Sequence, residues 1–149
     1  FIIVEDKKRM TKLATACLNQ YWISQSSFLL VVCYDERSIK ELFPEKAAEY
    51  SIQNTAIIST YIMLKATESG LGTCWVAIEK KEEVSRILKL PDFIVPSHII
   101  TIGYPKDWHK KTTRNETNLI TYFEEYPERV KEFSTFPLKS KIKRLGKGK

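Results

Sequence analysis

Residues 66–76 read Ala66-Thr67-Glu68-Ser69-Gly70-Leu71-Gly72-Thr73-Cys74-Trp75-Val76 and lie where the hydrophobic pattern changes from helical to extended. The preceding segment, 47–69, is apolar on nearly every side at helical spacing, which is typical of a helix in the core or at a subunit interface. Gly70 predicts the end of this helix, because glycine readily adopts the left-handed conformation of a C′ residue. The residues that follow, 73–78, have the composition of a strand.

Similar changes of pattern recur along the chain and predict an alternating order of elements. Residues 28–34, Phe-Leu-Leu-Val-Val-Cys-Tyr, are continuously apolar, which indicates a strand covered on both faces. Asp6 is a candidate N-cap for the helix that follows the first strand. Strands are expected at 1–4, 28–34, 73–78 and 94–102, and helices at 7–18, 47–69, 80–90 and 118–133. This order predicts an α/β domain, specifically an α+β three-layer sandwich.

The charge of the chain is unevenly distributed. The formal net charge is +6, and the basic tail 139–149 holds six Lys and Arg and no acidic residue. Residues 1–138 are therefore neutral, and we expect them to form a single domain that precedes the tail. The tail contains no aromatic residue for base stacking, so a solubilising role is favoured and nucleic acid is an unlikely partner.

The cysteine and histidine content argues against several kinds of site. Cys17, Cys33 and Cys74 cannot all pair within one chain, and their apolar surroundings favour buried thiols in a reducing, cytoplasmic compartment. His98 and His109 do not form a ligand cluster with the cysteines, so no metal is expected. His98, inside an apolar strand, is interpreted as a hydrogen-bonded structural residue. No apolar run approaches the length of about 18 residues that a membrane span needs.

The glycine turn leaves two interpretations open. It is not a phosphate-binding loop or a dinucleotide fingerprint, because it joins a helix to a strand and lacks the residues of those motifs. It could be a simple helix cap, or its small residues could let a flat ligand approach the backbone.

Several motifs in order resemble the nitroreductase family of FMN-dependent oxidoreductases. They are FIIVED at 1–6, ATESGLGTCWV at 66–76, VSRILKLP at 84–91 and IGYP at 102–105, and the resemblance covers residues 1–126. It implies a central mixed, mainly antiparallel sheet flanked by helices, in an intertwined homodimer with FMN at the subunit interface. It also implies ping-pong hydride transfer from NADH or NADPH through flavin N5 to a nitroaromatic, quinone or similar small-molecule acceptor.

The resemblance also implies where FMN binds, while no side chain is expected to be catalytic because the flavin carries the chemistry. The backbone donor near flavin N5 falls at Val76-Ala77-Ile78, where Ala77 replaces the glycine of many relatives. Gly72 belongs to the turn that shapes this strand.

Side chains are expected at the two ends of FMN. Asn19 and Gln20 match the amides that face the pyrimidine ring, although a polar helix terminus explains them equally well. Arg114, with Lys111, matches the basic residues that bind the phosphate, and solvated loop charge is the alternative.

One part of the family pattern lies outside this sequence. The Arg-Arg-Ser and Gln-Pro-Trp segments of the family precede the strand at which the chain opens, and Phe1 is not an initiator Met. We therefore expect further residues upstream. If the phosphate site is incomplete, the alternative function is a non-catalytic dimeric relative that binds flavin or another ligand.

Overall fold

The computed structural model describes residues 1–107 and 112–128. Internal contacts divide the chain into two units, Phe1–Trp108 and His109–Lys149. The predicted boundary between residues 138 and 139 lies outside the described residues, so the single domain 1–138 and the basic tail stay predictions.

The first unit contains a four-stranded sheet in which each described pair of neighbours is antiparallel. Its strands are β1 (Ile2–Val4), β2 (Phe28–Asp35), β3 (Gly72–Ala77) and β4 (Ile94–Gly103), in the order β1-β2-β4-β3. All four strands agree with the sequence predictions to within two residues at each end. The sheet is therefore antiparallel throughout its described part, where the family resemblance implied a mixed one.

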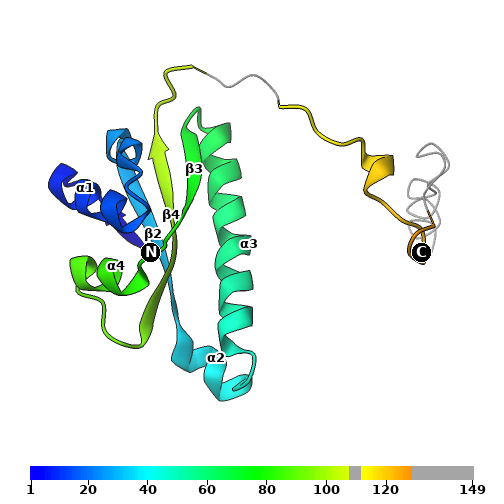
Figure 1. The fold of residues 1–149 in the computed structure, drawn as a ribbon, viewed down its shortest axis with the longest axis horizontal. Coiled ribbons are helices and arrows are strands. Elements are labelled where there is room, and N and C mark those ends of the chain that lie inside the picture. Colours follow the sequence, from blue (N-terminus) through cyan, green and yellow to red (C-terminus); the bar gives the residue numbers. More distant parts are fainter. Residues whose placement is uncertain (108–111, 129–149) are drawn as a thin grey trace, which may run out of the picture. The chain divides into compact units, whose positions relative to one another are not determined.

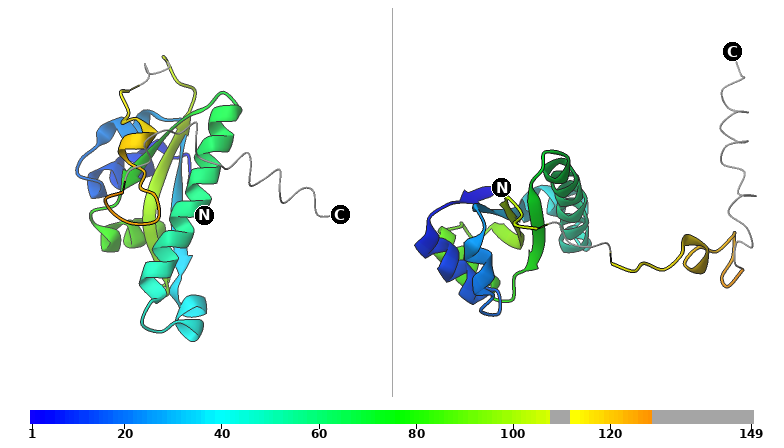
Figure 2. Two further views of the ribbon diagram at one scale, coloured as in Figure 1. Left: turned by 90° about the vertical axis from the view of Figure 1, so that its right-hand side faces the viewer. Right: turned by 90° about the horizontal axis from the view of Figure 1, so that it is seen from above.

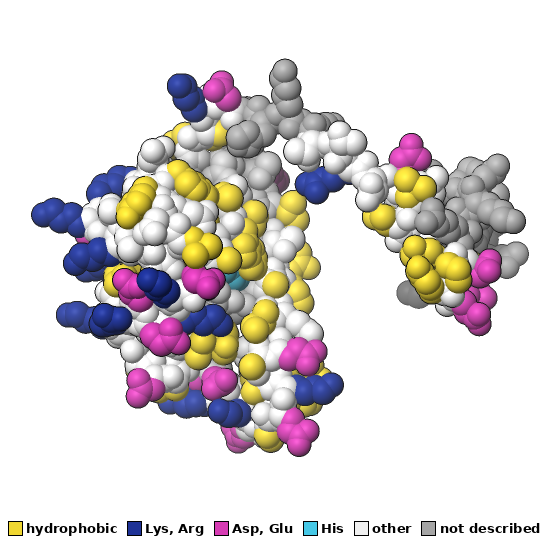
Figure 3. Space-filling model, in the orientation of Figure 1, with side chains coloured by type: hydrophobic (Ala, Val, Ile, Leu, Met, Phe, Trp, Pro, Cys, Tyr) yellow, Lys and Arg dark blue, Asp and Glu magenta, His cyan; other side chains and the backbone are white. Residues whose placement is uncertain are grey.

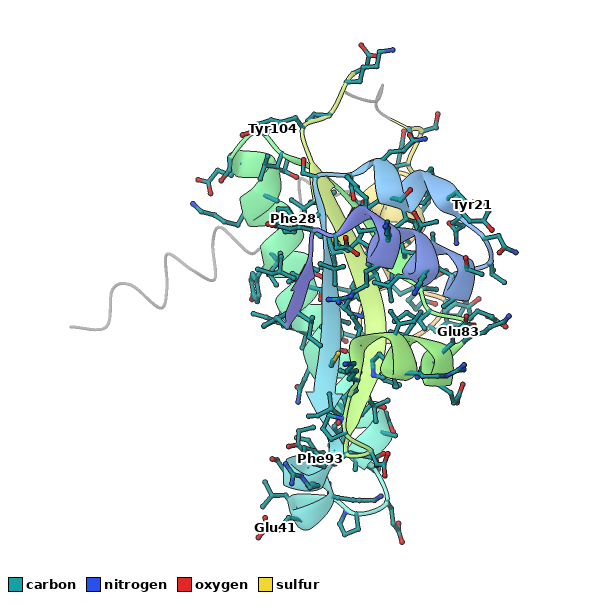
Figure 4. All side chains as sticks on the ribbon, turned by 90° about the vertical axis from the view of Figure 1, so that its left-hand side faces the viewer. Tyr21, Phe28, Glu41, Glu83, Phe93 and Tyr104 are labelled. Carbon is teal, nitrogen blue, oxygen red and sulfur yellow. The ribbon has the colours of Figure 1, made fainter. Side chains whose placement is uncertain are left out.

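Helices cover both faces of the sheet, which confirms the three-layer prediction (Figures 1 and 2). One layer contains α1 (Lys7–Ala16), the 3₁₀ helix η1 (Tyr21–Gln25) and α4 (Lys81–Leu88). Figure 4 looks onto this layer, in which Tyr21 belongs to η1 and Glu83 to α4. The other layer is α3 (Ala47–Glu68), preceded by the short α2 (Glu36–Leu42) at one end of the sheet.

Side chains of the central strand β2 alternate between two cores, because successive residues of a strand point to opposite faces. Leu29 and Val31 belong to the larger core under α1 and α4. Leu30 and Val32 belong to a smaller core under α3. The prediction of a strand covered on both faces is confirmed.

The predicted start of α1 at Asp6 and the predicted end of α3 at Gly70 are also confirmed. The Asp6 side chain caps α1 by accepting a hydrogen bond from the backbone N–H of Arg9 at 2.8 Å. After α3, Gly70 has a φ of +77°, and the N–H of Leu71 donates to the Ala66 carbonyl at 2.9 Å. The left-handed glycine therefore turns the chain directly from α3 into β3.

Helix α3 packs differently from the expectation of a core helix. Its buried residues are small or hydroxyl-bearing: Ala47, Ser51, Thr55, Ser59 and Ala66. Three of its large side chains lie outward, with Ile57 56%, Tyr61 65% and Leu64 63% exposed, whereas Ile62 and Met63 are partly buried against the smaller core. In Figure 3 hydrophobic side chains are visible along this side of the unit. The core interpretation of α3 is wrong, and the subunit-interface interpretation stays a prediction.

The second unit is described over residues 112–128 and contains one 3₁₀ helix there, η2 (Thr117–Leu119). The helix predicted at 118–133 is wrong within 118–128, where bends and turns follow η2. Pro127 lacks the N–H that a helix interior requires, and Glu124 has a left-handed φ of 61°.

Candidate functional site

The candidate site is built on β3, which is an edge strand of the described sheet. Val76 and Ile78 turn their side chains into the larger core, whereas Ala77 between them is exposed. Strand β4 pairs with one side of β3, and no described strand pairs with the other side. The strand can therefore offer backbone groups and a small side chain to an approaching ligand. The flavin contact that the family resemblance implies for Val76-Ala77-Ile78 stays a prediction.

Gly72 shapes the beginning of this strand. A Cβ atom added there would lie 3.2 Å from Cβ of Pro105, which follows the last residue of β4 by two positions. The absence of a side chain lets the two chain segments pack closely, and this supports a structural role for Gly72 in the turn.

Asn19 and Gln20 lie in the turn between α1 and η1. Leu18 and Asn19 have left-handed φ values of 58° and 57°, which residues other than glycine seldom adopt. Asn19 is exposed and accepts a hydrogen bond from the Tyr21 hydroxyl at 3.3 Å, and Gln20 is half-buried. Both interpretations of this pair, as flavin ligands or as a polar helix terminus, remain compatible with these positions.

The end of α1 meets the end of β3. The backbone N–H of Lys80 donates to the Ala16 carbonyl at 3.2 Å. Cys17 and Ile78 belong to the same core. The end of α1 therefore contacts the chain just after β3, and the turn with Asn19 and Gln20 follows this end of α1. The segments 19–20 and 76–78 thus lie in one region of the first unit.

The two predicted phosphate ligands are placed differently. Arg114 is exposed, in a stretch of the second unit without helix or strand. Lys111 lies outside the described residues. Their roles stay predictions.

A buried polar cluster lies beneath β3, between β4 and α3. His98 Nε2 and Ser59 Oγ form a hydrogen bond of 2.7 Å, and His98 Nδ1 and Ser97 Oγ form one of 3.0 Å. Ser97 Oγ is in turn 3.0 Å from Thr55 Oγ1. Burial lowers the pKa of His98 to about 4, so the ring is neutral at physiological pH. The prediction that His98 is a hydrogen-bonded structural residue is confirmed.

The partners of His98 were not identified from the sequence. A signal existed, because Ser51, Thr55 and Ser59 repeat every four residues and so share one face of α3. That face is the buried one, and the hydroxyls of Thr55 and Ser59 meet β4 there.

The three cysteines are free thiols in different settings. Burial raises the pKa of Cys17 to about 11 and raises that of Cys33, which keeps both protonated and unreactive at neutral pH. Cys74 is exposed, so its assignment to the core is wrong. Strand β3 is at the sheet edge, and its outward positions are not enclosed as those of β2 are.

Two further properties concern the described part of the chain. Residues 1–107 and 112–128 contain no cluster of three or more His, Cys, Asp or Glu side chains that could hold a metal ion. Within the same ranges, none of the helices combines the length and the hydropathy that crossing a bilayer requires.

These residues fit the FMN that the family resemblance implies. The exposed Ala77 leaves room for a flat ring against a strand edge that no strand of the described residues pairs with, and two amide side chains follow the adjacent end of α1. A large side chain or a covering strand at Ala77 would have contradicted such a site.

Known proteins have related sequences. The nitroreductase family model matches residues 2–104. A protein from Archaeoglobus fulgidus, named as an NADH dehydrogenase/NAD(P)H nitroreductase, is 27% identical over 72% of this chain and 61% of its own length. The FMN reductase [NAD(P)H] of Bacillus subtilis is 24% identical, over 89% of this chain and 64% of its own.

Solved structures agree with this relationship. An FMN-dependent nitroreductase from Clostridium difficile superimposes with a TM-score of 0.69 at 25% identity, covering 84% of this chain and 74% of that one. The chain spans less than two thirds of the length of the two curated relatives above. The match of the family model to residues 2–104, more than half of the chain, shows that the chain belongs to the nitroreductase family.

Proposed function

We propose that this chain is the flavin-binding part of an FMN-dependent oxidoreductase, which takes electrons from NADH or NADPH and passes them to a small-molecule acceptor. Membership of the nitroreductase family supports the proposal, as do relatives whose names include FMN and NAD(P)H. Nitroaromatic compounds and quinones are the acceptor classes that we propose.

The observation that carries the proposal is the geometry of β3. Ala77 is exposed between the buried Val76 and Ile78, on a strand whose outer edge is not paired with a described strand. An isoalloxazine ring needs a flat surface and a backbone donor at one edge, and this strand can offer both.

Bound FMN would supply the hydride-accepting and hydride-donating atom, and the protein would supply position and electrostatics. In this proposal the backbone at Val76-Ala77-Ile78 donates to the ring edge. Asn19 and Gln20 pair with the polar groups of the pyrimidine ring, because an amide can both donate and accept. Arg114 and Lys111 bind the phosphate.

We also propose that the active form is a homodimer. The outward face of α3 supports this, because Ile57, Tyr61 and Leu64 are all more than half exposed there. Apolar side chains grouped in this way mark association surfaces more often than free surfaces.

The proposal is tested by titrating the purified protein with FMN and following flavin fluorescence. We expect saturable binding, and then oxidation of NADH or NADPH that depends on an added quinone or nitroaromatic compound. Full-length protein that does not bind FMN would contradict the proposal.

The second candidate is a dimeric relative that binds flavin without turnover. Ala77 favours it, because its methyl group stands where many relatives have glycine and could crowd the ring. FMN binding without acceptor-dependent NAD(P)H oxidation would support this candidate over the enzyme.

A further inference from the structure

Trp75 of β3 and His98 of β4 stack face to face. Their ring centroids are 3.4 Å apart and their planes differ by 14°. His98 is 2% exposed and Trp75 is 40% exposed, so the imidazole is the inner ring and the indole the outer one. Two flat rings in such contact constrain each other, and the buried one sets the plane of the other.

The buried ring is held from two elements. Ser59 of α3 bonds to its Nε2 at 2.7 Å, and Ser97 of β4 bonds to its Nδ1 at 3.0 Å. Thr55 of α3 holds Ser97 in turn. Both ring nitrogens are therefore satisfied, and rotation of the imidazole would leave buried polar atoms without partners, which is costly.

The stacked pair lies next to the candidate flavin edge. In the β3–β4 ladder, Ala77 is directly opposite His98. Trp75 precedes Ala77 by two residues and so projects from the same face of β3. A change in the plane of the imidazole would therefore move the indole and the short backbone segment that ends at Ala77.

We propose that His98 is a positioning residue: held by Ser59 and Ser97, its ring fixes the Trp75 indole and thereby the backbone of Trp75-Val76-Ala77 at the proposed flavin edge. The role in binding rests on the proposed FMN function. The effect of His98 on the β3 backbone does not rest on that function, because it involves only residues of the flavin-free protein.

The test compares Ser59→Ala with Thr60→Ala, the neighbouring α3 hydroxyl, which bonds only within its own helix to the Ala56 carbonyl. Amide hydrogen exchange is measured in flavin-free protein for residues 74–77 and, as an internal reference, for residues 29–32 of β2. We expect Ser59→Ala to speed exchange at 74–77 about fivefold, the effect expected for one buried hydrogen bond, and to leave 29–32 unchanged. Thr60→Ala should match wild type in both segments.

Two further variants separate positioning from general damage. Ser59→Thr returns a hydroxyl and should restore slow exchange at 74–77. His98→Phe keeps a ring that can stack on Trp75 but loses both hydrogen bonds, and it should also speed exchange there. Faster exchange spread equally over 29–32, or no difference between Ser59→Ala and Thr60→Ala, would overturn the proposal.

FMN titration of the same variants tests the link to binding. We expect the FMN Kd to rise about fivefold in Ser59→Ala and to recover in Ser59→Thr. An unchanged Kd in Ser59→Ala would overturn the positioning of the flavin edge. If wild type itself does not bind FMN, the proposed function fails, while the exchange measurement still decides whether His98 fixes β3.

Discussion

Gly72 and Ala77 are small residues at opposite ends of β3, and only Gly72 has a neighbour in the protein that restricts its size. Gly72 is restricted by Pro105, whose Cβ would be 3.2 Å from an added Cβ. Ala77 is exposed, so the protein itself places no comparable restriction on its side chain. A change at Ala77 should therefore affect a ligand at the surface more than it affects the fold.

This difference makes Ala77→Val a test of the flavin edge. Two added methyl groups would occupy the space proposed for the ring, and we expect the FMN Kd to rise at least about tenfold while the Tm stays close to that of wild type. Ala77→Gly should bind FMN as well as wild type or better. Equal affinity of Ala77→Val and wild type, measured by flavin fluorescence, would place the ring elsewhere.

His98 predicts a specific pH dependence of stability. Burial lowers its pKa to about 4 from an ordinary value of 6.5, so the unfolded chain binds a proton more readily than the folded one. Stability is therefore lost as pH falls from about 6.5 towards 4, by about 2 kcal/mol at pH 5. Urea unfolding at pH 7 and pH 5 measures this, and His98→Gln should lose less stability between the two values. An identical loss in the variant would show that other groups cause it.

At the scale of elements, helix α3 has two different faces. Its inner face is small and polar, and its hydroxyl groups reach the strand behind it. Its outer face is apolar and exposed. The sequence analysis did not separate these faces, because apolar residues occur on nearly every side of the helix. The 39-residue separation of Ser59 and His98 also hid their contact, which depends on how α3 is placed over β4.

The end of α3 supports a stability prediction. Gly70 has a φ of +77° and open space around it, so the cost of a side chain there is conformational and not steric. Gly70→Ala should lower the free energy of unfolding by about 1 kcal/mol. Gly70→Asn should cost less, because asparagine tolerates the left-handed conformation better. Denaturant unfolding of both variants measures this order, and equal costs would contradict the argument.

At the scale of the molecule, the strands, the caps and the layers followed from patterns local in sequence. Asp6 begins α1 and Gly70 ends α3 as expected, and the apolar run 28–34 forms β2, an inner strand of the sheet. What could not be predicted depends on contacts distant in the chain: the pairing of Ser59 with His98, the exposure of Cys74 and the ring stacking of Trp75. The flavin edge at Ala77 came from the family resemblance and not from composition.

At the same scale, we predict that two chains associate through the exposed face of α3. Tyr61→Glu places a charge on the exposed apolar face of α3, and burying that charge in an interface would be costly. We expect wild type to sediment as a dimer of 17.3 kDa chains and the variant to shift towards monomer. Thr11→Glu, on the exposed side of α1, adds the same charge in the opposite helical layer and should remain dimeric. A monomeric wild type would contradict the proposal directly.

The open side of β3 has a consequence for handling the protein. Its residues, Gly-Thr-Cys-Trp-Val-Ala, carry no charge and include no proline, the two features that usually prevent strands of separate molecules from joining. Without a ligand over this edge, molecules can add to one another strand by strand. Turbidity on storage should therefore develop sooner in flavin-free protein than in protein saturated with FMN, because bound FMN would slow aggregation.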